Sequence, residues 1–180
     1  MNKKLVIGII IGVVVIVGAT AAVIVMNMNA ANQTTISKTA ATGKPVRACA
    51  LLSLTEAKSI LGETAKLGDN PNAVTNESVS VDTCSYVNGA SEVADIRVIT
   101  VMVRTGLDDA GKASNEDAFQ PNGEARAEDA EAVGGYGEQA YWSETMKQLS
   151  ILDGAVWINI VYGGESTLSA TKLVADSVVN

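Results

Sequence analysis

The hydrophobic and polar positions divide this 180-residue chain into an apolar N-terminal run and a longer polar part. Residues 5–26 contain no charged residue and consist mostly of Ile, Val, Gly and Ala. As a helix this run would be roughly 33 Å long, close to the hydrocarbon thickness of a bilayer. It is longer than the ~7–15 apolar residues of a typical signal peptide, and no lipoprotein-type cysteine ends it. The sequence therefore predicts an uncleaved transmembrane signal-anchor helix.

The charges around the run set its expected orientation. Of the 13 basic residues only Lys3 and Lys4 precede it, so the rest of the chain carries 11 basic and 20 acidic residues, a net charge of −9. By the positive-inside rule, residues 1–4 stay in the cytoplasm and the C-terminal part is exported. We expect a single-pass protein of the cell membrane with an extracytoplasmic domain.

Small residues in the run offer a surface for contact between helices. Gly8 and Gly12 have the GxxxG spacing at which two membrane helices approach closely, which predicts a packing face and a route to a homodimer. The other interpretation is that glycine is simply common in membrane helices.

The polar part consists of two regions of different composition. Residues 27–45 are rich in Asn, Thr, Ala and Ser and have no apolar periodicity, which is typical of a flexible linker. Residues 46–180 have the composition of a globular protein and are numerous enough for one domain with its own core.

The hydrophobic period within this domain changes from helical to extended and back. A capping box at Ser53 and Glu56, followed by Gly62, predicts a short helix whose apolar face is Leu54, Ala57, Ile60 and Leu61. β-branched runs predict strands over 79–87 and 95–104, and residues 137–143 are expected to form a further strand leading into the hairpin. The strand 95–104 is apolar on both sides, which predicts a central strand covered on both faces.

A hairpin and a helix are expected to complete the domain. Residues 148–152 and 155–162 flank Asp153-Gly154, a signal for a two-residue type I′ turn. Residues 167–179 then form a helix with an apolar face of Ala170, Leu173, Val174 and Val178. The predicted fold class is α+β: an antiparallel sheet with a short N-terminal and a C-terminal helix packed on it.

The only two cysteines are Cys49 and Cys84. An even pair in an exported domain favours a disulfide, which would close a loop of about 35 residues and stabilise the fold by roughly 3–4 kcal/mol. The alternative is two buried free thiols. The pair lacks the CxxC spacing of redox-active sites.

Composition excludes several kinds of chemistry. The chain has no histidine, so it contains neither a Ser-His-Asp triad nor a zinc site with imidazole ligands. The negative charge argues against nucleic-acid binding. Nucleotide-binding P-loops and the GxSxG and SxxK serine motifs are absent from the sequence. We therefore expect no enzymatic activity, no cofactor and no metal.

Residues 107–131 contain eight acidic and two basic residues. Their order does not match an EF-hand, although a calcium site or an acidic docking surface is the functional alternative. We expect a solvated insertion between strands with at most a turn or two of helix.

Five of the seven aromatic residues fall within residues 136–162. Trp157 shares a mixed strand face with Asn159, which predicts partial exposure. Trp142 follows Tyr141 directly, so one of these two side chains should lie near the surface. Trp142 and Trp157 are the candidate ligand- or partner-binding residues, with core packing as the alternative for both.

Three stretches carry a resemblance: 49–62 (CALLSLTEAKSILG), 84–86 (CSY) and 133–142 (VGGYGEQAYW). The domain resembles exported lipoprotein domains of unknown function from high-GC Gram-positive bacteria. It is similar in layout to extracellular sensor domains of bacterial membrane Ser/Thr kinases. The resemblance implies an α+β domain at the cell envelope with a Cys49–Cys84 disulfide, and no enzymatic activity. The chain departs from those lipoproteins because it lacks the anchoring cysteine, and it has no kinase domain.

These observations together predict a membrane-anchored, non-catalytic binding or sensor-like domain for an envelope protein or a cell-wall ligand. The alternative is a structural subunit of an envelope membrane complex that assembles through its transmembrane helix at Gly8 and Gly12.

Overall fold

The computed structural model describes residues 43–70, 72–164 and 166–179. The predicted signal-anchor over 5–26, with Gly8 and Gly12, lies outside these residues. Among the residues that are described, every helix is too short or too polar to cross a membrane.

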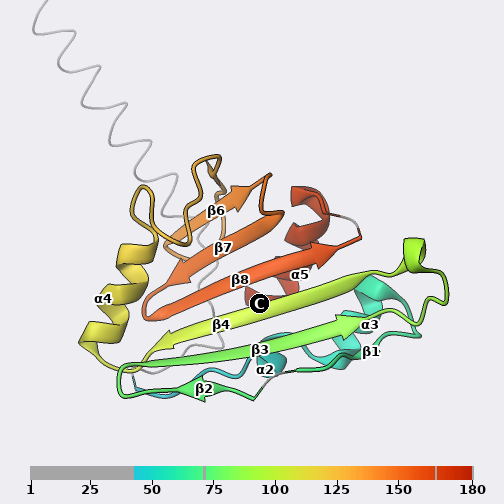
Figure 1. Cartoon of the computed structure of the whole chain (residues 1–180), viewed down its shortest axis with the longest axis horizontal. Helices are drawn as coiled ribbons and strands as arrows, with labels where there is room; N and C mark the ends of the chain where they lie inside the picture. Colours follow the sequence, from blue (N-terminus) through green and yellow to red (C-terminus); the bar gives the residue numbers. More distant parts are fainter. Residues whose placement is uncertain (1–42, 71, 165, 180) are drawn as a thin grey trace, which may run out of the picture. The chain divides into compact units, whose positions relative to one another are not determined.

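The described chain forms an antiparallel sheet of eight strands with helices packed on it, which confirms the predicted α+β class (Figure 1). The helices are α2 (Ala48–Leu51), α3 (Leu54–Leu61), α4 (Asp109–Ala118) and α5 (Leu168–Val179), with a 3-10 turn η1 (Val93–Asp95). The strands are β1 (Lys66–Leu67), β2 (Val74–Thr75), β3 (Val79–Val87), β4 (Val98–Gly106), β5 (Glu131–Ala132), β6 (Gln139–Ser143), β7 (Gln148–Asp153) and β8 (Val156–Gly163). Their order is β1-β3-β4-β8-β7-β6-β5, and β2 also pairs with β3.

The sheet has two faces that differ in how they are covered. Side chains along β3 and β4 alternate between buried and half-buried, as the period of two in a strand requires. The inner face carries the buried set and packs against α2, α3 and α5. The opposite, outer face is in contact with α4, which packs on β4 and β8 at one end of the sheet (Figure 1).

The main core lies between the inner face and its three helices. Large side chains on the inner face that are fully buried include Ile99 and Val101 of β4, Leu149 and Ile151 of β7, and Ile158 and Ile160 of β8. At ~25 cal/mol per Å² of buried apolar area, this continuous cluster is the main source of stability in the domain.

The N-terminal helix begins and ends as predicted. The Ser53 side chain accepts a hydrogen bond from the Glu56 backbone N–H, and the Glu56 side chain accepts one from the Ser53 N–H, so the capping box is present. Gly62 ends the helix with φ 97°. The predicted apolar face is wrong at Leu54, which is 41% exposed because it occupies the first helical position, a turn before the buried Ala57 and Leu61.

The C-terminal helix was predicted with a buried face that is rotated from the one observed. Leu173 is 58% exposed, whereas Thr171 and Ala175 are fully buried beside Val174. With 3.6 residues per turn, Leu173 lies on the side of the helix opposite to Thr171 and Ala175. The small side chains of Thr171 and Ala175 let α5 approach the sheet closely. This close contact decides which side of the helix is buried.

The predicted hairpin is present, but its turn is shifted by one residue. Asp153 pairs with Val156, so the two loop residues are Gly154 and Ala155 rather than Asp153 and Gly154. Gly154 has φ 58° at the first central position, and Ala155 is not among the positive-φ residues. This use of glycine fits a type II′ turn instead of the expected type I′.

The predicted strand over 95–104 is central, between β3 and β8, but it begins later, at Val98. The shift arises because η1 occupies Val93–Asp95. The expectation that both of its faces are covered is wrong in part. Thr100 and Met102 on the outer face are only half-buried.

The acidic segment is more ordered than predicted. It contains α4, a ten-residue helix, rather than a turn or two. The Asp108 side chain caps this helix by accepting a hydrogen bond from the Gly111 N–H at 2.7 Å. One side of α4 is apolar or small, so it packs on the sheet at Gly111, Asn115 and Ala118 while its acidic residues face solvent.

Candidate functional site

A small second cluster of apolar side chains joins α4 to the outer face of the sheet. It consists of Ala118, Phe119, Ala125, Leu152 and Trp157, with Met102 and Tyr141 at its edge. The Phe119 ring meets the Trp157 ring edge-on, with centroids 5.9 Å apart. Leu152 and Trp157 are opposite each other on β7 and β8. The cluster therefore covers one end of the outer face.

Polar contacts fix α4 in this position. Asn115 is fully buried, and its Nδ2 donates to the backbone oxygens of Ala155 at 2.8 Å and Arg104 at 3.2 Å. Its Oδ1 accepts a hydrogen bond from the Arg104 guanidinium. The same guanidinium lies 5.7 Å from the Trp157 ring centroid. Gly111 allows close approach, because a Cβ there would lie 1.9 Å from the Ser78 backbone oxygen.

Both candidate tryptophans are buried. Trp157 is 5% exposed, so the predicted partial exposure is wrong, and the reason is the Phe119 cluster that covers its side of β8. Trp142 is 4% exposed on the inner face, while the adjacent Tyr141 is half-buried, in line with the expectation that one of the two lies near the surface. The two tryptophans lie on opposite faces of the sheet, so they do not form one site.

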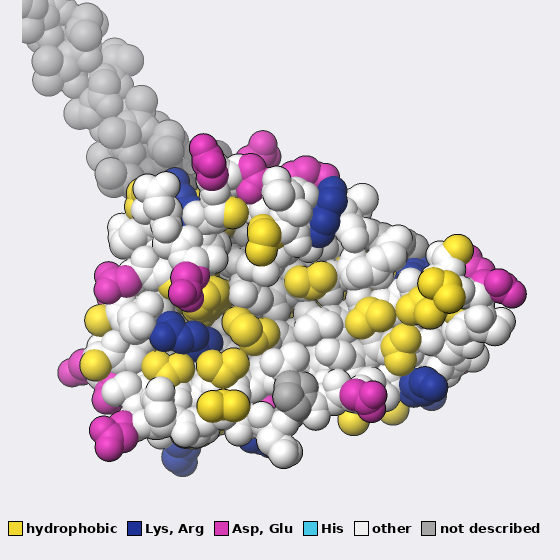
Figure 2. Space-filling model, in the orientation of Figure 1, with side chains coloured by type: hydrophobic (Ala, Val, Ile, Leu, Met, Phe, Trp, Pro, Cys, Tyr) yellow, Lys and Arg dark blue, Asp and Glu magenta, His cyan; other side chains and the backbone are white. Residues whose placement is uncertain are grey.

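Among the residues that the structure describes, the part of the outer face that lies beside α4 is called the outer strip. It comprises Thr83, Ser85 and Val87 of β3, Val98, Thr100 and Met102 of β4, Asn159, Val161 and Gly163 of β8, and Gln148 and Ser150 of β7. Ser150 is buried and the others are half-buried. None of these residues carries a charge. Figure 2, which views this face, shows mainly white and yellow atoms over the middle of the sheet and most charged atoms near its rim.

Polar side chains on the outer strip are paired with one another across the strands. Ser85 and Thr100 share a hydrogen bond of 3.1 Å between their hydroxyls. Asn159 Oδ1 accepts from Ser150 Oγ at 2.7 Å and from Trp157 Nε1 at 2.8 Å. These groups already make hydrogen bonds within the protein. Covering them with a partner would therefore cost less desolvation free energy than covering unpaired groups.

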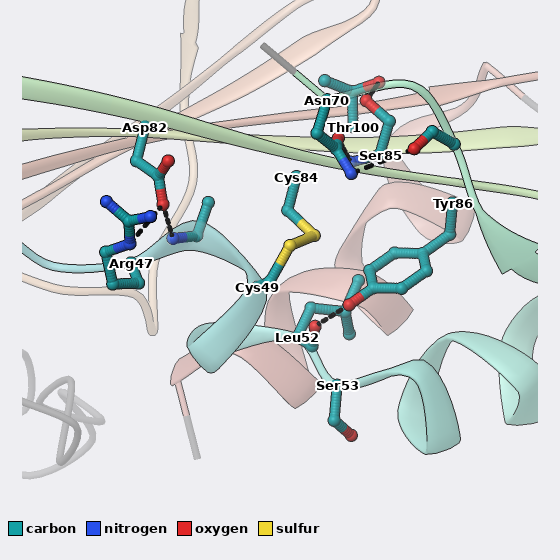
Figure 3. The surroundings of a disulfide bond; sticks show 12 residues. Arg47, Cys49, Leu52, Ser53, Asn70, Asp82, Cys84, Ser85, Tyr86 and Thr100 are labelled. Carbon is teal, nitrogen blue, oxygen red and sulfur yellow. Dashed lines mark hydrogen bonds and ion pairs between the residues drawn. A yellow bond between two sulfur atoms is a disulfide. The ribbon is translucent and has the colours of Figure 1, made fainter. Parts of the chain in front are cut away.

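The predicted disulfide is confirmed and lies on the inner side of the sheet. It joins Cys49 of α2 to Cys84 of β3 (Figure 3). Next to it, Asp82 Oδ2 accepts from the Ala48 N–H at 2.8 Å and faces Arg47 Nε at 3.5 Å. Cys84 is fully buried while Cys49 is exposed. The bond therefore attaches the chain entering the domain to the sheet.

Two buried tyrosines of the main core each hold a helix or its flank. Tyr86 OH donates to the Leu52 backbone oxygen at 2.5 Å, and burial raises the pKa of this phenol (Figure 3). Tyr136 OH donates to Asp176 of α5 at 2.7 Å. Burial and this carboxylate raise the pKa of Tyr136 well above its usual value. Both hydroxyls stay protonated at neutral pH and act as donors that attach helices to the sheet.

Two hollows are lined by residues outside the outer strip. One, of about 590 Å³, is formed where the β3–β4 and β8–α5 connections meet the end of α3. The Asn88 amide stabilises its wall, since Nδ2 donates to the Asp95 oxygen and Oδ1 accepts from the Arg97 N–H. The other, of about 450 Å³, is lined by Ala127, Glu128, Asp129, Thr145 and Met146. Small-molecule sites are usually lined by apolar and aromatic side chains, and neither hollow has an aromatic wall.

The carboxylates near the second hollow have structural partners. Asp129 accepts from the Thr145 N–H at 2.7 Å and from Ser143 Oγ at 2.8 Å, and these bonds lower its pKa. Glu144 accepts from Lys147 and from Trp142 Nε1, which also lowers its pKa. Within the residues that the structure describes, no cluster of three or more His, Cys, Asp or Glu side chains has the geometry to hold a metal ion.

Sequence reasoning missed the outer strip, although a signal for it was present. Alternate positions of 83–87, 98–102 and 159–163 are Thr, Ser, Val, Met, Asn or Gly, without a single charge. Residues 95–104 are apolar on both sides, which is also part of that signal. This pattern predicts a strand that is buried on both faces, but it fits equally well a strand with one uncharged, partly exposed face.

Comparison with known proteins adds no relative to this description. No protein-family model, no curated protein and no solved structure matches the chain.

Proposed function

We propose that this protein is a membrane-anchored, extracytoplasmic, non-catalytic binding domain, and that its binding surface is the outer strip. The observation that carries the proposal is the lack of charge on this half-buried surface. One face of an antiparallel sheet often meets solvent, and it then alternates apolar inward residues with polar outward ones. Here the outward positions of the strip are Thr, Ser, Val, Met, Asn, Gln and Gly, and none of them carries a charge in a chain with 33 charged residues.

Partner surfaces are depleted of charge at their centre and polar at their rim. The outer strip has this composition, with charged residues of neighbouring segments around it (Figure 2). The buried tryptophans then support binding indirectly: Trp157 holds Asn159 at the edge of the strip through its 2.8 Å hydrogen bond. This replaces direct contact between tryptophan and ligand.

Support for the compartment comes from two independent features. The disulfide between Cys49 and Cys84 is typical of proteins that fold in an oxidising environment. The apolar run over 5–26, with Lys3 and Lys4 before it, favours anchoring with the domain outside. A tethered domain needs only modest affinity, because the anchor raises the local concentration of membrane partners.

The test is in-cell crosslinking of the full-length chain with Thr100→Glu or Val161→Glu, each of which adds a charge to the outer strip. Both variants should lose the crosslinked product, because an unpaired charge would be buried in the complex. The control is Ser59→Glu on the exposed side of α3, which should retain it. Equal products from all three variants would contradict the proposal.

A second variant separates the domain from the anchor. Replacing residues 1–30 by an unrelated membrane anchor should leave the product in place if the domain carries the function. Loss of the product in this chimera, and in a Gly8→Ile, Gly12→Ile variant, would instead support a structural subunit that assembles through its transmembrane helix.

A further inference from the structure

One row of side chains crosses the outer face from strand to strand. Residues directly opposite each other on antiparallel strands lie on the same face. This row consists of Thr83, Met102, Asn159, Ser150 and Tyr141. All of them except Ser150 are half-buried. Because Tyr141 and Met102 also pack at the edge of the Phe119 cluster, the row joins the outer strip to that cluster.

Arg126 lies at the Tyr141 end of this row. Its guanidinium carbon is 4.6 Å from the centroid of the Tyr141 ring. Within the described part of the chain, this guanidinium forms neither a hydrogen bond nor an ion pair, although it belongs to the acidic segment 107–131. Arg126 is also half-buried. A positive charge is therefore partly withdrawn from water with an aromatic ring, and no carboxylate, as its partner.

A second arginine lies at the other end of the aromatic cluster. Arg104 is 5.7 Å from the Trp157 ring centroid, and an amide and a hydroxyl of α4 hold its guanidinium. The Phe119 ring connects the two ends, since its centroid is 6.2 Å from that of Tyr141 and 5.9 Å from that of Trp157. Figure 2 shows basic atoms among hydrophobic ones beside α4. Arg104 is thus a fixed charge, whereas Arg126 keeps its donors free.

The free amide group of the row is also a hydrogen-bond donor. Asn159 uses its Oδ1 for Ser150 and Trp157, so its Nδ2 has no partner among the described residues. A guanidinium has five N–H donors and no acceptor. A group that binds along this row must therefore supply acceptors. Beside Arg126 the strongest acceptor is one that carries a negative charge.

A carboxylate of a partner protein meets these requirements. It accepts hydrogen bonds only, and its two oxygens match the planar fork of a guanidinium. Arginine, tyrosine and methionine are enriched in protein–protein interfaces, and Arg126, Tyr141 and Met102 meet at the edge of one cluster. Free small ligands prefer concave sites, and neither hollow described above includes any of these residues.

The charge of the remaining domain makes this contact selective. Residues 27–180 carry a net charge of −9, so most of the surface repels a partner's carboxylate. Arg126 and Arg104 provide the place where such a group is attracted. Like-charge repulsion elsewhere and attraction here would together fix the orientation of the partner.

We propose that Arg126 is the main contact residue at the edge of the outer strip, and that it binds an Asp or Glu carboxylate of a partner protein in a bidentate ion pair. Arg104 adds a second positive charge, and Asn159 adds neutral donors along the same row. This inference rests on the proposed binding function of the strip. It goes further by naming the contact residue and the chemistry of the partner.

The experiment places the photo-crosslinking amino acid p-benzoylphenylalanine at Thr83 of the full-length chain, in the cells that produce it. Thr83 lies in the same row but at the far end from Arg126. Leu173, which is 58% exposed on α5, is the control position. Crosslinked partner residues are identified by mass spectrometry, and retention of the disulfide is checked for each variant.

Three substitutions are compared in this background. Arg126→Met keeps an unbranched side chain over the Tyr141 ring and removes the charge, whereas Arg126→Lys keeps the charge without the planar fork. The matched control is Lys172→Met, which removes a positive charge 5.7 Å from the ring of Tyr136. A charge swap completes the set: Arg126→Glu in this chain, combined with Arg in place of the acidic residue of the partner nearest the crosslink.

We expect Arg126→Met to lower the yield of crosslinked product by about tenfold or more, because a hydrogen-bonded charge pair is lost. Arg126→Lys should lower it less, and Lys172→Met should leave it unchanged. Arg126→Glu should abolish the product, and the charge swap should restore it. Since a change in the partner cannot refold this domain, restoration separates a lost contact from a lost fold.

Other outcomes separate this inference from the proposed function. An unchanged yield from Arg126→Met, or a charge swap that restores nothing, would overturn the role of Arg126 and leave the binding face standing. A crosslink to a second copy of the chain, a lipid or a glycan would overturn the partner protein. A product from Thr83 no more abundant than that from Leu173 in the otherwise native chain would overturn both proposals.

Discussion

The inner and outer faces of the same sheet differ in cover and in composition. Three helices and the disulfide enclose the inner face, where residues such as Ile158 and Leu149 are fully buried. Within the described residues, the outer face carries α4 and a strip of half-buried, uncharged side chains. The two faces are made by alternate residues of the same strands. The same strands therefore build a fully covered core face and a face that is only half-buried beside α4, and this second surface is the proposed binding surface.

The difference also shows in how each face uses polar groups. On the inner side, Tyr86 and Tyr136 donate to a backbone oxygen and to a carboxylate, so that they attach helices. On the outer side, Asn115 does this for α4, while Asn159 pairs only with its neighbours on the sheet. In these examples, Tyr86, Tyr136 and Asn115 hold helices or their flanks, whereas Asn159 bonds to side chains of its own sheet.

The largest effects are expected at the two tryptophans, one on each face. Trp142→Ala and Trp157→Ala should each lower the free energy of unfolding by about 3–5 kcal/mol, because each removes a large buried ring. Urea denaturation measures this loss. Met146→Ala, at a side chain that is 58% exposed, is the control and should change stability by less than about 0.5 kcal/mol. A variant that loses partner binding while its free energy of unfolding stays unchanged would show instead that the tryptophan contacts the partner directly.

The next effect concerns the covalent link that only the inner face has. The Cys49→Ala, Cys84→Ala double variant should lower the free energy of unfolding by roughly 3–4 kcal/mol, since the unfolded chain loses a cross-link over a separation of 35 residues. Urea denaturation with and without reductant checks it. Reductant should have no effect on the double variant. A wild-type chain whose two cysteines both alkylate when unfolded without reductant would show that the link is absent.

A smaller effect is expected where α4 is attached to the outer face. Asn115→Ala should cost about 1–3 kcal/mol, because it leaves the Ala155 and Arg104 backbone oxygens without their donor. Hydrogen exchange should show faster opening of α4 than of the inner core. Ser114→Ala is the matched control: Ser114 is exposed and accepts from Arg104 at 2.8 Å, so its loss should cost little. Equal losses for both variants would mean that Asn115 does not hold the helix.

The smallest effect is on how stability depends on pH, which should differ between the carboxylates Asp108 and Asp129 and the inner-face tyrosines. Backbone hydrogen bonds lower the pKa of Asp108, the α4 cap, and of Asp129. The stability that these carboxylates contribute is present above their unfolded pKa of about 3.9 and is lost as the pH falls through their lower folded pKa. Asp108→Asn and Asp129→Asn should reduce the acid-side loss in thermal melts below about pH 4.

The inner-face tyrosines should act at the opposite end of the pH scale. Burial raises the pKa of Tyr86 and Tyr136, so their contribution is complete below about pH 10 and is lost as the pH rises from there toward the folded pKa. Tyr136→Phe should flatten the alkaline limb of the melting curve and leave the acid limb unchanged. An alkaline limb that is identical in the variant would show that Tyr136 ionises equally well in the unfolded and folded chains.

Much of the fold follows from local patterns. The capping box at Ser53, the alternation along 79–87 and the glycine after Asp153 are effects of residues a few positions apart, so one sequence is enough to detect them. The sequence prediction was wrong in detail where local periodicity allowed two helix faces to be buried and tertiary packing selected one of them. Leu173 and Ala175 could each face the core by periodicity, and the close approach of α5 to the sheet selected the smaller residue.

The sequence by itself determined the α+β class, the order of its main elements and the pairing of its only two cysteines. It also predicted an apolar anchor over residues 5–26 and the absence of histidine chemistry. Only the tertiary structure decided that Trp157 is covered by Phe119, that the acidic segment supplies a helix to the outer face, and that the strip beside this helix is half-buried among the described residues. The physical reason is that the burial of a sheet face depends on segments that are far away in the sequence. Alternation along a strand assigns each residue to a face, but the packing of distant segments decides whether that face is buried.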